Sequence, residues 1–240
     1  MEFHDNEHDP DSCLDVWKGF YNIVYPNLLG EYFDFSLLKD DETSNKCKRW
    51  YIKYKKETDR REKYPFFKLA GDCIFNFNSL KKERYVQLLG DDKEAIALLE
   101  ECCNMHHTFE NMALLPITGS LNNQKQGGRY GWDRPDKHIK GLQELFDKKS
   151  MDILNYCRNE ESKEAIINYF GIFNNNINTY FNIIYLLDDK WIKRLTEFAN
   201  KYHNIDSKDV AISYMNMAKD FWIDRKKSIE NATTQNLEEK

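Results

Sequence analysis

The second half of the chain carries apolar residues at helical spacing almost without interruption from Pro135 to Ile229. Residues three and four apart share one face of a helix, so this spacing predicts a series of amphipathic helices. The clearest stripe lies in the predicted helix 207–229 and consists of Ala211, Tyr214, Met217, Ala218, Phe221, Trp222 and Arg225. Another predicted helix begins at Pro135, with Asp133 or Arg134 as its cap. Further helices are predicted at 151–158, 163–174, 176–187 and 189–203, which together give a helical bundle from about 135 to 229.

The first part of the chain mixes strand and helix patterns. Residues 31–38 are expected to be extended, and Trp50, Ile52 and Tyr54 alternate with polar residues as in an edge strand whose lysines face solvent. A second strand is predicted within 66–77. Helices are predicted at 80–89 and 91–104, and a first helix is capped by Asp11 or Ser12 and ends before Pro26. The predicted class is therefore α+β and predominantly α, with a small mixed N-terminal part and a few strands.

The composition is that of one folded unit. Of the 240 residues, 41% are hydrophobic and 14% aromatic, which is enough to bury a sizeable core. No internal repeat and no Gly/Ser/Pro linker divides the chain, so we expect a single α+β domain over 1–230 and a polar C-terminal tail over 231–240. The net charge of -5 gives no overall basic field for nucleic acid, although a local basic patch stays open.

Membrane insertion and export are not indicated. No apolar run approaches the ~20 residues of a membrane helix. The acidic start lacks the basic and apolar regions of a signal peptide. The six cysteines form no Cys-x-x-Cys pair, which favours buried free thiols in a reducing compartment. We therefore expect a cytoplasmic protein without a membrane partner.

Residues 106–136 interrupt the regular pattern and hold the candidate ligand site. Four of the ten glycines and two of the five prolines lie between 116 and 136. Glycines let backbone N–H groups approach a ligand, and lysine and arginine beside such donors suit a phosphate or a carboxylate. The candidate ligand-binding residues are Asn111, Asn122, Asn123, Lys125, Arg129 and Arg134. The other interpretation is a structural loop, in which the asparagines cap turns and the arginines pair with Asp133 and Asp136.

His106, His107 and Glu110 are the candidate catalytic residues. A histidine near a carboxylate can act as a general base or a metal ligand. Neighbouring residues on a strand point to opposite faces, so at most one of the two histidines would serve a site there. The simpler interpretation is a core or surface histidine. The acidic cluster at 4–11 lacks the spacing of a known metal site, so no metal is predicted.

Several short motifs follow one another in a characteristic order. They are Asp5 with Asp9-Pro10-Asp11-Ser12, then Trp17, Pro26 and Gly30, then Asn111 with Leu114-Leu115-Pro116, then Leu121-Asn122-Asn123-Gln124-Lys125, and finally Asp133-Arg134-Pro135-Asp136. This order resembles a family of uncharacterised bacterial proteins (a domain of unknown function). Its members have an Asp-Pro-Asp start, a His-Thr-(Ile/Phe)-x-Asn turn, an Asn-rich loop, an Asp-Arg-x-Asp helix start and a helical C-terminal half. The resemblance covers most of the chain and implies one domain, with no activity to carry over.

A second, local pattern consists of Asn111-Met112-Ala113-Leu114-Leu115 followed by Asn122-Asn123-Gln124-Lys125. It is similar to the back half of HNH endonuclease motifs. The resemblance implies that Asn111 holds a metal-binding hairpin and that Asn122 ligates a divalent ion. The family places its general-base histidine roughly fifteen residues before that asparagine. The corresponding stretch here, 93–99, contains no histidine, so the similarity is confined to the back half of the motif.

These observations lead to two functional expectations. The first is a bacterial or phage protein that binds or processes a phosphate-bearing ligand, a nucleotide or nucleic acid, with a role in toxicity or defence. The alternative is a non-enzymatic helical module that binds another protein or itself, with a structural Asn/Gly loop. The chain has no P-loop, dinucleotide-binding, nucleophile-elbow or zinc-protease motif, and the sequence leaves the identity of any cofactor unknown.

Overall fold

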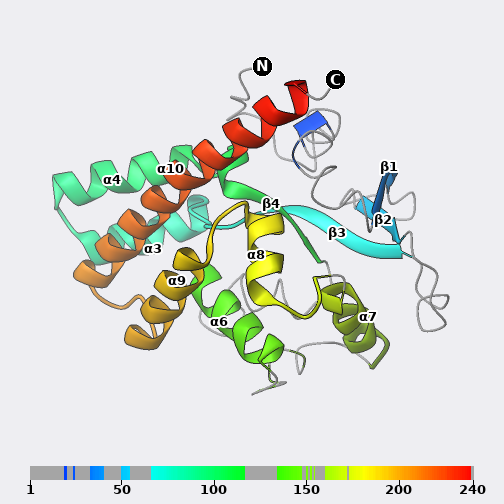
Figure 1. Cartoon of the computed structure of the whole chain (residues 1–240). Helices are drawn as coiled ribbons and strands as arrows, with labels where there is room; N and C mark the ends of the chain where they lie inside the picture. The colour runs from blue at the N-terminus through cyan, green and yellow to red at the C-terminus, as the bar shows by residue number, and fades with distance from the viewer. Residues whose placement is uncertain are drawn as a thin grey trace.

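The computed structural model in Figure 1 describes residues 19–20, 24, 33–40, 50–54, 66–116, 134–147, 150, 152, 154, 160–171 and 173–238. Within these residues the fold is α+β and predominantly α, as the sequence predicts. The strands belong to the N-terminal half, and helices make up the described part from Pro135 onward.

The described strands form one antiparallel sheet in the order β1-β2-β3-β4. They are β1 (Phe33–Asp40), β2 (Trp50–Tyr54), β3 (Phe66–Cys73) and β4 (Met112–Pro116). The prediction of an edge strand at Trp50–Tyr54 is wrong, because β2 pairs with β1 on one side and β3 on the other. Alternating side chains indicate a strand, but pairing between distant segments decides its position in the sheet.

The described α-helices are α3 (Ser79–Leu89), α4 (Lys93–Asn104), α6 (Pro135–Phe146), α7 (Glu160–Gly171), α8 (Ile177–Tyr185), α9 (Asp189–Lys201) and α10 (Lys208–Glu238). A 3-10 turn, η1 (Phe109–Asn111), leads into β4. The helices predicted at 80–89, 91–104, 163–174, 176–187 and 189–203 are confirmed within three residues at each end. Most of the helix predicted at 151–158 lies outside the described residues. The last helix is longer than predicted, because α10 continues through residues 231–238 of the expected tail.

Helix starts follow the local sequence closely. Asn78, Asp92 and Asn176 each cap a helix, and each side-chain oxygen accepts from one or two backbone N–H groups of the first turn. Pro135 occupies the first turn of α6, as predicted. Arg134 stands at the cap position of α6, but its side chain makes no capping hydrogen bond.

The core is a continuous cluster of buried residues that extends from Phe20 to Ile229. Helix α10 contacts α3, α4 and η1, and Figure 1 shows it running across α3 and α4. Aromatic rings fill the space beneath it: Phe75 packs 5.2 Å from Phe221 and 5.9 Å from Trp222 between ring centroids. All members of the stripe predicted on this helix, including Arg225, are buried.

The surface of the helical part is tied by ion pairs between helices. Lys82 pairs with Glu100, Lys219 with Glu101, and Arg194 with Asp220. None of the described helices combines the length and the apolar content that crossing a membrane requires.

Candidate functional site

Asn111 joins three parts of the fold through its side chain. Its Oδ1 accepts hydrogen bonds from the backbone N–H of Phe75 and the indole N–H of Trp222, both at 2.9 Å. Its Nδ2 donates to the carbonyl oxygens of Phe75 at 2.7 Å and His106 at 3.0 Å. An amide offers two donors and two acceptor lone pairs, so this completely buried side chain uses its full capacity on protein atoms.

The two candidate histidines lie in the turn that follows α4, and not on a strand. The expectation that they point to opposite faces is therefore wrong. The rings of His106 and His107 contact each other, with centroids 4.4 Å apart and planes inclined by 40°. Both residues are partly exposed. The turn thus presents two imidazoles together, which a strand could not do.

Glu110 belongs to η1, where its residue is 8% exposed. Its backbone carbonyl, together with that of Phe109, accepts from Nη1 of Arg225 at 2.8 and 2.9 Å. The Nε of Arg225 donates to the carbonyl oxygen of Tyr185 at 2.9 Å. This buried arginine of α10 therefore fixes η1 against the end of α8. In the sequence, this role is indicated by the position of Arg225, a charged residue that falls at helical spacing within the apolar stripe of the predicted helix.

Arg134 is also fully buried, and its partners lie within the protein. Its Nε and Nη2 donate to the carboxylate of Asp136 at 2.8 and 2.6 Å, while Nη2 and Nη1 donate to the carbonyl oxygens of Tyr202 and His203 at 2.8 and 3.0 Å. Burial opposes the charged guanidinium, but the hydrogen bonds and charge of Asp136 outweigh burial and raise the pKa of Arg134. The pair anchors the start of α6 to the turn after α9.

The first turn of α6 buries further polar side chains. Lys137 and His138 are 9% and 2% exposed, and the sequence pattern did not single them out. The pKa of Lys137 is lowered, first by burial and then by the positive charges of Arg134 and Lys140, with Asp136 acting in the opposite sense. The available sign of their burial in the sequence is a run of consecutive polar residues at a capped helix start. Such a run usually indicates a turn exposed to solvent.

The side chains of Asn111 and Arg134 contact parts of the core that lie at different positions along α10. Asn111 bonds to Trp222, whereas the guanidinium of Arg134 lies 5.9 Å from the ring centroid of Phe198, which packs 5.6 Å from Tyr214. Tyr214 precedes Trp222 by eight residues on α10. At a rise of 1.5 Å per residue the two positions are about 12 Å apart along that helix.

Asn122, Asn123, Lys125 and Arg129 lie outside the described residues. Their segment begins after Pro116, at the end of β4, and leads into Arg134 at the start of α6. The ligand-binding role of these four residues therefore stays a prediction. Among the described side chains, no group of three or more His, Cys, Asp or Glu residues is placed to hold a metal ion.

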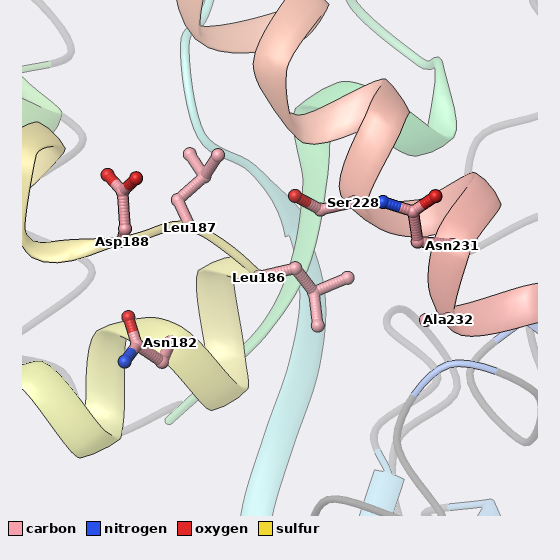
Figure 2. A pocket seen from close by; sticks show the side chains of 7 residues that line it. All are labelled: Asn182, Leu186, Leu187, Asp188, Ser228, Asn231 and Ala232. Carbon is pink, nitrogen blue, oxygen red and sulfur yellow. The ribbon is translucent and has the colours of Figure 1, made fainter. Parts of the chain in front are cut away.

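Away from these residues, the described structure contains a pocket of about 360 Å³ between the end of α8 and α10. It is lined by Asn182, Leu186, Leu187, Asp188, Ser228, Asn231 and Ala232. Figure 2 shows Asn182 and Asp188 towards the left of Leu186 and Leu187, and Ser228 and Asn231 towards the right.

Comparison with protein-family models gave no match, and comparisons with curated proteins and with solved structures found no significant similarity.

Proposed function

We propose that the protein binds or processes a phosphate-bearing ligand, a nucleotide or nucleic acid, near the start of α6. The supporting observation is the positive charge held there: Lys137 lies among Arg134, which pairs with Asp136, and Lys140, which lies 3.9 Å from Glu144. Since the pKa of Lys137 is lowered by burial and by its cationic neighbours, an anion beside it would stabilise its charged form. The positive end of the helix dipole acts in the same direction.

The Gly-rich segment that precedes α6 completes the proposed site. Asn122, Asn123, Lys125 and Arg129 would contact the ligand directly. Arg134 would act by position and charge, because its N–H groups are directed at protein oxygens. Asn111 would in the same way hold the turn that carries the candidate acid–base residues His106, His107 and Glu110.

The proposed setting is the cytoplasm of a bacterium or of a phage-infected cell, with a role in toxicity or defence. Free thiols support a reducing compartment. Cys73, Cys102 and Cys103 are free, and burial raises the pKa of the Cys102 thiol, which makes it unreactive. The proposed bacterial origin rests on the resemblance of the motif order to that of uncharacterised bacterial proteins.

The test is binding of pyrophosphate and of a short single-stranded oligonucleotide, measured by calorimetry with Lys137→Met and with Lys163→Met as the matched control. Lys163 pairs with Glu160 on α7, outside the proposed site. We expect about tenfold weaker binding to Lys137→Met, the effect of losing one charged hydrogen bond, and no change in the control. Incubating the oligonucleotide with magnesium and the protein tests processing in the same samples.

The pH dependence of binding gives a second readout. A bound anion raises the lowered pKa of Lys137, so binding takes up a proton and affinity falls as the pH rises through that pKa. Lys137→Met should lose this slope. Equal affinities and equal slopes in the two variants, or no binding of either probe to the unaltered protein, would contradict the proposal.

The alternative is a non-enzymatic helical module that binds another protein or a second copy of the chain. It is favoured by the internal hydrogen bonds of Asn111 and Arg134, which a structural loop requires. Its interface would use exposed apolar side chains, such as Ile167 on α7, which is 43% exposed. Light scattering tests it: a dimer that Ile167→Glu dissociates supports the module, and a monomer that captures no protein counts against it.

A further inference from the structure

The pocket between α8 and α10 is held open by contacts at both ends of the segment 186–188. Immediately before the segment, the carbonyl oxygen of Tyr185 accepts from Arg225 of α10 at 2.9 Å. Three residues after its end, the indole N–H of Trp191 donates to Asp224 of α10 at 3.0 Å. The segment that lines one side of the pocket is thus fixed to α10, the helix that lines the other side.

Leucines form the middle of the pocket. Leu186 ends α8 in the left-handed conformation (φ 58°, ψ 34°), where glycine is the usual residue. The Leu186 and Leu187 side chains are 8% and 6% exposed, and this burial offsets the backbone strain. Figure 2 shows the two leucines between the polar groups of the pocket. The middle therefore suits an apolar ligand body about as long as the segment between the polar ends.

The polar lining is rich in hydrogen-bond acceptors. Asp188 is its one charged residue, and no lysine or arginine belongs to the lining. The hydroxyl of Ser228 donates to the carbonyl oxygen of Asp224 at 3.3 Å, so its oxygen faces a ligand as an acceptor. The last turn of α8 adds the negative end of a helix dipole, and the start of α9 at Asp188 adds the positive end of another. The carboxylate of Asp188 and the acceptor oxygen of Ser228 favour N–H donors and positive charge in a ligand.

From this lining we propose that the pocket binds a small organic cation, a primary ammonium or guanidinium group on a short apolar body. The cationic head would lie beside Asp188 and Asn182, the body over Leu186 and Leu187, and the far end near Ser228 and Asn231. This site is separate from the charged start of α6 and takes a ligand of opposite charge.

A lysine of the protein competes for the same carboxylate. Lys190 Nζ lies 3.3 Å from Asp188 and 3.6 Å from Asp224. A cationic ligand would displace Lys190 from Asp188 and leave it with Asp224. Removing this lysine should therefore strengthen binding, whereas removing the charge of Asp188 should weaken it. General loss of structure cannot produce these opposite signs.

The experiment uses phenethylammonium as the probe and 3-phenylpropionate as a matched anion of similar size. Binding is followed by NMR through the indole N–H resonance of Trp191. We expect saturable binding of the ammonium alone. Asp188→Asn should bind it about fivefold more weakly and Lys190→Met more tightly, in line with the modest energies of exposed ion pairs. Asp206→Asn, an exposed acid elsewhere, is the control and should leave the affinity unchanged.

A variant that fills the pocket gives an independent readout. Ala232→Trp should abolish binding, and Thr234→Trp, on the same helix but outside the lining, should not. The proposal is overturned if the anion binds as well as the ammonium, if Lys190→Met weakens binding, or if Ala232→Trp has no effect. Absence of any saturable shift would overturn it as well.

Discussion

At the scale of the residue, single buried polar side chains hold this fold together where apolar packing alone would leave backbone groups unsatisfied. Asn111 acts as a substitute for backbone: it pairs with both the N–H and the C=O of Phe75 just beyond the end of β3. It also satisfies the indole of Trp222. A buried amide with every group paired contributes stability, whereas an unpaired one destabilises.

Asn111→Asp should expose this dependence on the amide. The change replaces two donors by an oxygen that faces the carbonyls of Phe75 and His106, so ionisation of the introduced carboxyl group is opposed and its pKa rises in the folded protein. We expect about 3–5 kcal/mol of destabilisation at pH 8.

The sign of the pH effect follows from linkage. A carboxyl group whose pKa is higher in the folded state holds its proton more tightly there, so the variant gains stability as the pH falls toward and below that pKa. Urea denaturation of the variant and the unaltered protein at pH 8 and pH 5 measures this. A loss of stability that is the same at both pH values would show that ionisation plays no part.

At the scale of the element, the Asn174–Asn176 run has a conformational explanation. Asn174 and Asn175 have positive φ values of 55° and 51°, a region that asparagine tolerates better than most residues. Asn176 then caps α8, and its Oδ1 accepts from the N–H groups of Asn178 and Thr179. The sequence shows only an asparagine run; the turn between α7 and α8 requires it.

Asn176→Ala should destabilise the protein by about 1 kcal/mol, the usual effect of losing a helix cap. Asn178→Ala is the matched control, since its side chain is exposed two residues into the same helix and should change stability by less than about 0.5 kcal/mol. Thermal and urea denaturation measure both. Equal effects of the two changes would contradict the capping role.

The strands show which elements a local sequence pattern predicts and which it does not. The segments at 50–54 and 66–73 could be predicted because apolar and aromatic residues bound by polar stretches indicate strands. Strand β4 was missed: its five residues sit inside an irregular segment, and their run is too short to give a period. It becomes a strand because Met112 to Pro116 pair with Cys73 to Leu69, across a chain separation that includes α3 and α4.

At the scale of the whole molecule, one buried cluster connects the two halves of the chain. It includes Phe20, the end of the sheet and the helices up to Ile229. Helix α10 holds this cluster together, since Tyr214, Trp222 and Arg225 contact residues of the first half. Sequence periodicity predicts that α10 has an apolar face but not which segments meet it.

A single core predicts a single unfolding transition. The far-ultraviolet signal of the helices and the signal of the five tryptophans, which include the buried Trp191 and Trp222, should lose their native values at the same urea concentration. This also tests the expected single domain over 1–230. An earlier transition in either signal would mean that a part of the chain unfolds independently.

The sequence by itself determined the class of the fold, the positions of most helices and the buried stripe of α10, because these depend on the spacing of apolar residues and on caps within a few positions. The pairing of Arg134 with Asp136, which the structural-loop interpretation predicts, is confirmed. Only the tertiary structure decided the place of β2 in the sheet, the pairing of β4, the partners of Asn111 and Arg225, and the contacts of Arg134 with Tyr202 and His203. The physical reason is that these strand pairings and buried hydrogen bonds join residues that are distant in the chain, and the sequence around one partner does not indicate the other.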